Sequence, residues 1–386
     1  MKVCQTRKPI IAILSGLDHN TLPPDDPRQT YSSIERLVYL LAKGFINRGY
    51  EVHVAATRDS KRSIEALGAA FFPYLYLPRG SQVEGVSSRE TLENLRNISI
   101  TQALKHFSRI GVDIIHNHER FGVQKAAELG MENVVTTIHW DLTHPDIKPY
   151  FDAAPKQSVI GISEDQMTSY TGSGSLGVVY NGIETGSCSG NFSKKKSLLV
   201  LGRVTPDKGV HEAIELAHML QCDLLIAGKT DPHEVEFDRQ MRKRVQENGY
   251  RGKVKFLGPV NHEGRERLFD QAQALLMLNR QGRFREPCGL VSIEAQAKGV
   301  PVIATDLGAT REIIVPGKTG FLVNPYLSKE AFFEACKNSV YLVGDLNPED
   351  CREQSKKFHH SFMVDGYEEK FLNVFTSLQK KHRVAV

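Results

Sequence analysis

Residues 34–56, IERLVYLLAKGFINRGYEVHVAA, contain the change of pattern that decides the fold. Over residues 34–45 the apolar side chains recur on one helical face, as in an amphipathic helix that packs on a core. The helix is predicted to stop near Gly49, after which residues 51–56 form an apolar strand. Because another buried strand is predicted at residues 9–14, PIIAIL, this part of the chain is one strand–helix–strand unit of a parallel sheet.

The same alternation of short apolar strands and amphipathic helices continues along almost the whole chain. Further strands are predicted at residues 70–75, 114–115, 134–138, 159–162, 198–202, 224–228, 254–257, 274–278 and 302–305, and helices at 210–220, 290–298 and 358–381. The alternation stops over residues 171–196, which are rich in Gly and Ser and end in three consecutive Lys. That composition predicts a linker or loop between two α/β halves of similar size.

The predicted domain organisation follows from this break. Residues 1–184 are expected to form an N-terminal Rossmann-like domain and residues 185–360 a second one, with a helical segment at 361–386. Two doubly wound domains that face each other leave a cleft at the carboxyl ends of both sheets. Ligands of open α/β sheets bind at such edges, beside helix N-termini.

Composition and charge exclude several classes of protein. With 49 basic and 45 acidic residues, the net charge of +4 is too small and too mixed to indicate a nucleic-acid partner. No apolar run approaches the roughly 20 residues of a membrane span. The start, MKVCQTRKPIIAILSGL, does not resemble a secretory signal, and the six Cys are scattered without a CxxC pair. We therefore expect a cytoplasmic protein, and its oligomeric state is not readable.

The most informative loop is REPCGLVSIEAQAKG, at residues 285–299. Pro287 and Gly289 interrupt the backbone before a predicted helix, so Glu286 lies on the loop and Glu294 inside the helix. The start of this helix offers unpaired backbone N–H groups to an anion, and a nearby carboxylate can accept hydrogen bonds from sugar hydroxyls. Taken alone, two Glu at this spacing are also typical of ordinary surface charges.

A second loop, LGRVTPDKG at residues 201–209, directly follows a buried strand. Arg203 and Lys208 suit a diphosphate, because Arg supplies a planar fork of donors and Lys a point charge. In isolation they could equally be a pair of solvated cations.

The ordered set of motifs resembles the retaining GT-B glycosyltransferases of glycosyltransferase family 4, over nearly the whole chain. The motifs are TYSSIERLVYLLAKGFINRGYEVHVAATRDS (30–60), DIIHNHE (113–119), VVTTIHW (134–140), GISEDQ (161–166), VVYNGIE (178–184), GRVTPDKG (202–209), EPCGLVSIE (286–294), GVPVIATDLGATREII (299–314) and GKTGFLV (317–323). The resemblance implies an α/β fold of GT-B type: two Rossmann-like doubly wound domains facing a central cleft, with the C-terminal helix crossing back to the N-terminal domain.

The resemblance also implies which residues carry the chemistry. Arg203 and Lys208 would neutralise the diphosphate of a nucleotide-sugar donor as it leaves. Glu286 would contact hydroxyls of the donor sugar, and His139, at the end of VVTTIH, would lie beside the reacting sugar. Without the resemblance, His139 could be a strand-end histidine with a structural role only.

The remaining donor contacts implied by the resemblance come from the second half of the chain. Gly289 and Leu290, beside Cys288, would supply backbone N–H groups, and Glu294 would bind the ribose. The base would contact the backbone around Leu257. Cys288 stands where relatives more often have Phe, and we interpret it as a small apolar filler.

The sequence departs from the family pattern in its first loop. Many relatives have a Gly-Gly pair where this chain has Ser32 and Ser33, so the way in which this loop meets the donor or acceptor is open. His116 and His118 resemble a metal pair but are expected to orient a loop. The resemblance implies no metal site, and the absence of an Asp-x-Asp motif agrees with that expectation.

The sequence-based hypothesis is a retaining, metal-independent hexosyltransferase that needs no cofactor besides its donor. It would move a sugar from a nucleoside diphosphate, UDP by expectation, to a hydroxyl of a small polar or glycan acceptor bound by the N-terminal domain. Two alternatives stay open: an epimerase or hydrolase of nucleotide sugars with the same fold, and a non-catalytic module that binds the nucleotide sugar. An NAD-linked oxidoreductase would need Gly-x-Gly-x-x-Gly after the first strand, which is absent.

Overall fold

The computed structural model describes residues 7–17, 19–23, 25–26, 33–74, 89–184, 197–247, 254–280 and 284–384. Ser32, the end of the strand expected at 70–75 and the second part of the expected linker lie outside these residues.

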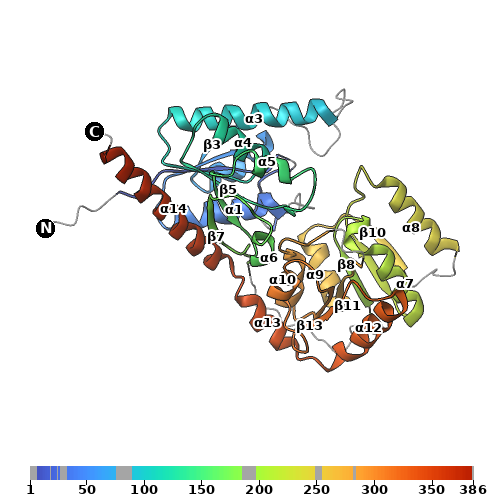
Figure 1. Ribbon diagram of the computed structural model, residues 1–386. Coiled ribbons are helices and arrows are strands. Elements are labelled where there is room, and N and C mark those ends of the chain that lie inside the picture. The colour runs from blue at the N-terminus through green and yellow to red at the C-terminus, as the bar shows by residue number, and fades with distance from the viewer. Residues whose placement is uncertain are drawn as a thin grey trace.

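The first half of the chain forms a parallel sheet wrapped by helices (Figure 1). Within the described ranges the sheet has seven strands in the order β3-β2-β1-β4-β5-β6-β7, and every neighbouring pair is parallel. Its strands are β1 (Ile11–Leu14), β2 (Val52–Ala56), β3 (Ala70–Pro73), β4 (Ile114–Asn117), β5 (Val134–Thr137), β6 (Ser158–Gly161) and β7 (Ser175–Val178). The helices are α1 (Ser33–Asn47), η1 (Arg58–Ser60), α2 (Lys61–Ala66), α3 (Arg89–Arg109), α4 (Arg120–Glu128), α5 (Lys148–Asp152) and α6 (Glu164–Met167).

The second half repeats this architecture. Its six described strands follow the order β10-β9-β8-β11-β12-β13, again with parallel neighbours. They are β8 (Ser197–Leu201), β9 (Leu224–Ala227), β10 (Val254–Gly258), β11 (Ala272–Met277), β12 (Val302–Thr305) and β13 (Gly320–Val323). The helices are η3 (Pro206–Lys208), α7 (Val210–Leu220), α8 (Val235–Glu247), α9 (His262–Gln271), α10 (Leu290–Ala297), α11 (Thr310–Ile313), α12 (Lys329–Leu342), η4 (Val343–Asp345), α13 (Pro348–Lys356) and α14 (His360–Val384).

Two Rossmann-like domains with parallel sheets confirm the predicted fold class. The predicted apolar runs form strands that are buried on both faces, as β1, β4 and β9 show with four buried residues each. The helix predicted at 210–220 and the strand predicted at 302–305 have those bounds in the structure.

One expectation about the first domain is wrong. Part of the segment interpreted as a linker, residues 171–196, forms β7 and pairs with β6. As the last strand of its sheet, β7 alternates exposed and partly buried residues, and its Gly177 has φ +90°. An edge strand of this kind lacks the continuous apolar run by which the other strands were predicted.

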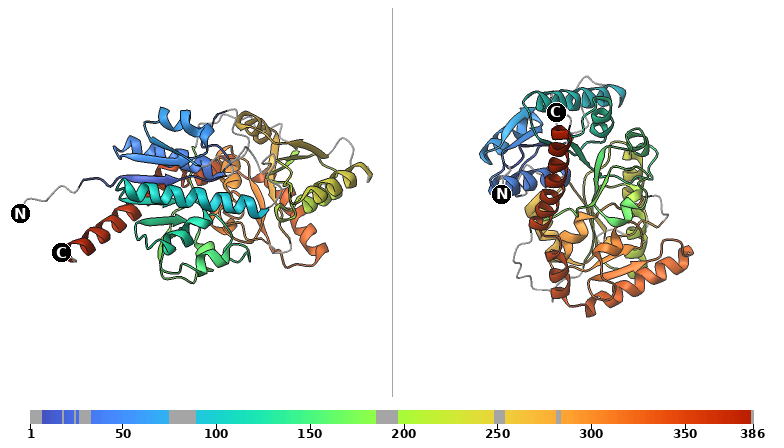
Figure 2. Two further views of the ribbon diagram at one scale, coloured as in Figure 1. Left: turned by 90° about the horizontal axis from the view of Figure 1, so that it is seen from above. Right: turned by 60° about the vertical axis from the view of Figure 1, so that its left-hand side comes forward.

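The C-terminal helix α14 packs on the N-terminal domain (Figures 1 and 2). Its apolar residues join the core formed by α1, β1 and β2: Met363, Val364, Tyr367, Phe371, Val374 and Phe375. The Phe371 ring stacks on Phe45 of α1, with centroids 5.6 Å apart. At the edge of this interface Arg48 pairs with Asp365 and Glu368, and the Tyr50 hydroxyl donates to Glu368 at 2.6 Å.

Both sheets reverse their strand order next to their first strand. The first domain reverses between β1 and β4, and the second between β8 and β11. The loops that follow these neighbouring strands diverge to opposite faces of the sheet and leave a crevice at its carboxyl edge. Side chains placed directly after β4, β8 and β11 are therefore the ones that the fold brings to a binding site.

The tight contact between α1 and α14 gives a testable prediction. A Cβ on Gly44 would lie 2.5 Å from Val364 Cγ2, so Gly44→Ala overpacks this interface, which typically costs about 1–3 kcal/mol. We expect Gly44→Ala to lower the urea midpoint in the wild-type background. In a Val364→Ala background the same change should cost less, because the two Cγ atoms are gone and only the Cβ of residue 364, at 3.3 Å, remains close.

Gly344, where a Cβ would meet nothing within 4 Å, provides the matched control for that experiment. An equal effect of Gly44→Ala in both backgrounds would contradict the packing described for α14.

Candidate functional site

A partly buried ion pair occupies the switch point of the second domain. Lys208, at the end of η3 after β8, places its Nζ 2.6 Å from Oε2 of Glu286, on the loop after β11. Only about a fifth of each side chain is exposed. Lys208 Nζ also lies 4.6 Å from the centre of the Phe284 ring. The pair therefore joins the two central loops of the sheet with a cation and an anion at its carboxyl edge.

Backbone contacts fix the Glu286 loop before any ligand is considered. The Glu286 carbonyl accepts from the Ala309 N–H at 2.9 Å, and the Phe284 carbonyl accepts from the Asn279 amide at 2.6 Å. Gly308 permits this approach, because it has φ +70° and a Cβ there would lie 2.6 Å from the Glu286 nitrogen. Glu286, on the loop after β11, is thus held by the loops that follow the two neighbouring strands, β8 and β12.

Arg203 lies beside this pair and is oriented by two carboxylates. Its Nη1 is 2.7 Å from Oδ2 of Asp231, and its Nη2 is 3.6 Å from Oδ2 of Asp207. Burial alone would lower the pKa of Arg203, but these two carboxylates outweigh it, so that the pKa is raised overall. Likewise, burial alone would raise the pKa of Asp231, whereas the His233 backbone N–H and Arg203 lower it. Two cations of fixed orientation therefore stand at one loop edge.

Glu294 joins the two domains. It lies inside α10, and its Oε1 is 2.7 Å from Nη1 of Arg36, on α1 of the first domain, and 3.5 Å from Nη1 of Arg265 on α9. Each of the three side chains is 13% exposed. Burial alone would raise the pKa of Glu294, but Arg265 and Arg36 lower it, so the carboxylate is charged.

Three histidines line the carboxyl edge of the first sheet. His116 is on β4, His118 directly follows β4, and His139 follows β5. Nδ1 of His118 lies 2.8 Å from Nε2 of His139. Burial lowers the pKa of His139 below its ordinary value and the pKa of the other two well below it. All three imidazoles are therefore neutral near pH 7.

Arg285 ties the Glu286 loop to the first domain. Its backbone N–H donates to Asp141 at 3.0 Å, and its guanidinium forms two hydrogen bonds with Asp165 on α6. Nearby, Glu312 of α11 accepts from the backbone N–H groups of residues 164 and 165 at 2.9 and 2.8 Å. The position of Glu286 is thus coupled to the contact between the domains.

The other predicted residues take distinct places. Gly289 caps α10 with φ +71°, and Leu290 is the first residue of that helix. Cys288 is buried, which raises the pKa of its thiol to about 12 and keeps it protonated, as suits an apolar filler. Leu257, on β10, is 43% exposed, and Ser33 is the exposed first residue of α1.

Sequence reasoning missed four charged residues of this region: Arg36, Asp231, Arg265 and Arg285. Arg36 and Arg285 stand within quoted motifs or directly beside them, at the start of a predicted helix and one residue before Glu286. Their partners lie 258 and 120 positions away along the chain, so only the folded structure pairs them.

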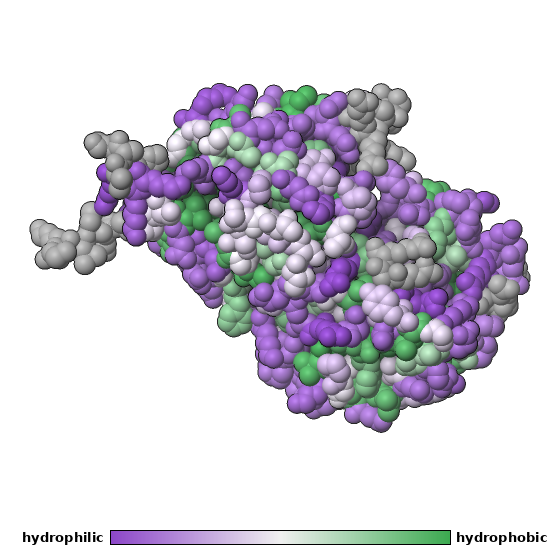
Figure 3. Space-filling model, in the orientation of Figure 1, coloured by the Kyte–Doolittle hydropathy of each residue, from purple (hydrophilic) through white to green (hydrophobic). Residues whose placement is uncertain are grey.

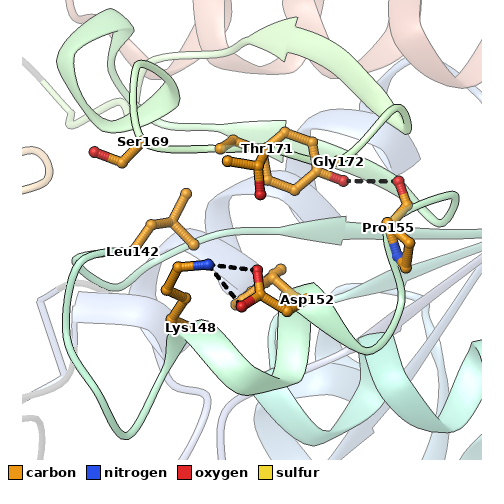
Figure 4. Close-up of a pocket in the computed structure, with 9 residues that line it drawn as sticks. Leu142, Lys148, Asp152, Pro155, Ser169, Thr171 and Gly172 are labelled. Atoms are coloured by element: carbon orange, nitrogen blue, oxygen red, sulfur yellow. Dashed lines mark hydrogen bonds and ion pairs between the residues drawn. The ribbon is translucent and has the colours of Figure 1, made fainter.

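Two pockets lie on the first domain, away from these residues. One, of about 90 Å³, is between α5 and the turn after α6 (Figure 4), where Lys148 Nζ donates to both carboxylate oxygens of Asp152. The other, of about 190 Å³, is between α3 and α4. None of the predicted site residues lines either pocket.

Hydrophilic residues predominate on the face drawn in Figure 3. Among the helices that the structure describes, none combines the length and the apolar character that crossing a membrane requires. The described side chains also contain no cluster of three or more His, Cys, Asp or Glu that could hold a metal ion.

Comparison with known families covers both domains. Residues 34–186 match the model described as Glycosyltransferase Family 4, and residues 188–357 match Glycosyl transferases group 1. The chain belongs to the family 4 glycosyltransferases. This agrees with the predicted resemblance and with the GT-B arrangement of the two sheets.

Individual relatives of this glycosyltransferase chain are distant. Glycogen synthase from Mycobacterium tuberculosis is 28% identical over 172 residues, which are 42% of this chain and 39% of that protein. The matched stretches cover 39% to 53% of the length of the first curated relatives.

Solved structures show the same fold over their full length. A glycosyltransferase from Rickettsia africae has a TM-score of 0.70 at 17% identity, covering 96% of this chain and 99% of its own. Anabaena HepE in complex with UDP-glucose has a TM-score of 0.65 at 18% identity, covering 96% and 100%.

The ionised Glu294 predicts a pH-dependent contribution to stability. Because its folded-state pKa is lowered from the ordinary value of 4.5, the contribution is fully present above that value and is lost as the pH falls through the folded pKa. We expect Glu294→Gln to reduce the free energy of unfolding by about 1–3 kcal/mol at pH 7. Urea unfolding should show that this difference is constant down to about pH 5 and shrinks below pH 4.5.

Glu334→Gln, which removes an exposed carboxylate on α12, controls for a general effect of charge removal. A Glu294→Gln difference that stays the same at every pH would contradict the ionised state described for Glu294.

Proposed function

We propose that this glycosyltransferase takes a hexose-type sugar from a UDP-sugar donor and transfers it to a hydroxyl group with retention of anomeric configuration. The observation that carries the proposal is the Lys208–Glu286 pair at the switch point, with Arg203 oriented beside it. The two cations, Arg203 and Lys208, can bind a diphosphate. The Glu286 carboxylate, 2.6 Å from Lys208, is then close to the sugar that the diphosphate carries.

The two cations act on the leaving group. When the bond between the sugar and the diphosphate breaks, negative charge grows on the β-phosphate and positive charge on the sugar. Arg203 and Lys208 stabilise the departing phosphate without reorganising, since carboxylates already fix their positions. No metal ion is needed in this account.

The acidic residues and His139 hold the donor in place. Glu286 accepts hydrogen bonds from hydroxyls of the donor sugar, and Glu294 accepts them from the ribose. Glu294 can do so because the two arginine contacts engage its Oε1, which leaves Oε2 for a ligand. His139, neutral at pH 7, contributes a hydrogen bond beside the reacting sugar.

Contacts between the domains exclude water from the reaction. Arg36 of the first domain pairs with Glu294 of the second, and Arg285 of the second domain pairs with Asp165 of the first. Electrostatic stabilisation of a leaving group is strong only in a site from which water is excluded. The acceptor is a hydroxyl compound that enters from the first domain, whose strand-end loops face the donor residues.

UDP-glucose is the donor to test first, because HepE, which shares this fold, was solved with it. The protein is incubated with UDP-glucose, with and without a panel of glycosides and polyols, and products are separated and examined by proton NMR. A new glycoside with the anomeric configuration of the donor supports the proposal. An inverted product contradicts retention.

Incubation with the donor alone separates the two alternatives. An epimerised nucleotide sugar or rapid release of free sugar would favour an epimerase or hydrolase. Saturable binding of UDP-glucose without any product, across the full acceptor panel, would favour a binding module.

The roles of the central ion pair predict a large loss of activity on substitution. We expect Lys208→Met and Glu286→Gln each to reduce kcat by at least about 10²-fold, the usual cost of removing one preorganised electrostatic group. Steady-state kinetics measures the loss, and unchanged circular dichroism and thermal midpoints exclude unfolding.

The pair Lys337 and Glu334, 3.3 Å apart on the surface of α12, offers matched controls. Lys337→Met and Glu334→Gln remove the same groups and should leave kcat within twofold of wild type. Activity of Lys208→Met or Glu286→Gln in that same range would overturn the assigned roles.

A further inference from the structure

We propose that His118 is a positioning residue for His139: its Nδ1–H donates to His139 Nε2 and so fixes His139 as the tautomer with its proton on Nδ1. Only the effect of this hydrogen bond on catalysis rests on the proposed function. The hydrogen bond itself can be observed without any substrate. It assigns a role to a residue of the HNHE motif that the donor site does not use.

The geometry requires that one of these two rings donates to the other. His118 and His139 follow β4 and β5, which are neighbouring parallel strands, so the two side chains meet at one sheet edge. The rings are nearly parallel, with an interplanar angle of 18° and centroids 5.1 Å apart. His118 Nδ1 and His139 Nε2 are separated by 2.8 Å, which is a full hydrogen bond between two neutral imidazoles.

The far side of His118 decides which ring is the donor. His118 is fully buried, and its Nε2 has no hydrogen-bond partner among the described residues. A buried N–H without an acceptor is rarer in proteins than an unused acceptor. The proton of His118 therefore belongs on Nδ1, where it has an acceptor, and Nε2 stays unprotonated.

The tautomer of His139 follows from that of His118. Because His139 Nε2 accepts a hydrogen bond, it has no proton, and the single proton of the neutral ring is on Nδ1. No further hydrogen bond engages His139 within the described parts of the chain. In contrast to His118, which is fully buried, His139 is partly exposed, so its Nδ1–H is available to a ligand oxygen.

The row of side chains behind His118 holds it in place. The ring centroids of His116 and His118 are 4.1 Å apart, and Nε2 of His116 lies 2.7 Å from the Thr137 hydroxyl. Thr137 in turn lies 2.9 Å from the hydroxyl of Tyr367 on α14. The C-terminal helix thereby supports the back of the histidine row.

The consequence for the proposed reaction is a specific one. His139 offers a donor to a hydroxyl or phosphate oxygen of the nucleotide sugar, and it does not take up a proton. A ring free to rotate or to change tautomer would present an acceptor there for part of the time. Loss of His118 should therefore reduce kcat more than it raises the KM for the donor, since the cations and Glu294 still bind the nucleotide.

Nitrogen-15 NMR tests the inference directly. The protein is labelled with [¹⁵N]histidine, and His139 is assigned by the signals lost in His139→Gln. In the wild type, long-range ¹⁵N–¹H correlations are expected to show a protonated Nδ1 and an unprotonated Nε2 for His139. A protonated Nε2 would overturn the proposal, whether or not the enzyme is active on UDP-glucose.

Three substitutions separate positioning from a merely structural role. His118→Asn keeps an amide donor near the place of Nδ1, His118→Gln moves it toward the place of Nε2, and His118→Phe keeps a ring without a donor. We expect His118→Asn to retain the wild-type tautomer of His139 and to keep kcat within about threefold of the wild-type value. Phe and Gln should lose the tautomer, and their kcat should fall at least tenfold with the donor KM changed less than threefold.

Equal kcat for the Asn, Gln and Phe variants, or a wild-type tautomer in His118→Phe, would contradict the positioning role. His218→Phe, at an exposed position of α7, is the control for the loss of a histidine. If no variant or wild type turns over any donor, the proposed function fails, while the NMR result still decides the inference about His118.

Discussion

The parallel arrangement of β8 and β11 is the constraint on which the rest of the site depends. Since both strands run in the same direction and the sheet order reverses between them, the loops after them must meet at one edge. That places Lys208 against Glu286 although they are 78 positions apart in the chain. Without the reversal, the loops would not open a crevice there, and the ion pair would be an ordinary surface contact.

The same constraint acts in the first domain and links the two halves. Its sheet reverses between β1 and β4, so His118 and His139 reach the corresponding edge, while α1 brings Arg36 to Glu294. The contacts of Arg285 with Asp141 and Asp165 hold the Glu286 loop against the first domain. The residues proposed to bind the donor and the histidine row are therefore parts of one arrangement, in which the contact between domains also positions the central loop.

Local sequence pattern predicted much of this, and its failures have a physical cause. Runs such as IAIL and VIAT are buried on both faces, so their composition identified the strands, and the placement of Glu286 on a loop and Glu294 in a helix followed from Pro287 and Gly289. The partners of Arg36 and Arg285 could not be predicted, because they depend on how two domains meet. β7 was missed because its residues alternate between exposed and partly buried and form no continuous apolar run.

The most direct test of a metal-free donor site is calorimetric titration of UDP, GDP and ADP into the protein, each with and without EDTA. A metal-free site in which Arg203 and Lys208 supply the positive charge predicts that UDP binds more tightly than the other two nucleotides and that EDTA does not change its Kd. Binding of UDP that is abolished by EDTA, or no binding of any of the three nucleotides, would contradict it.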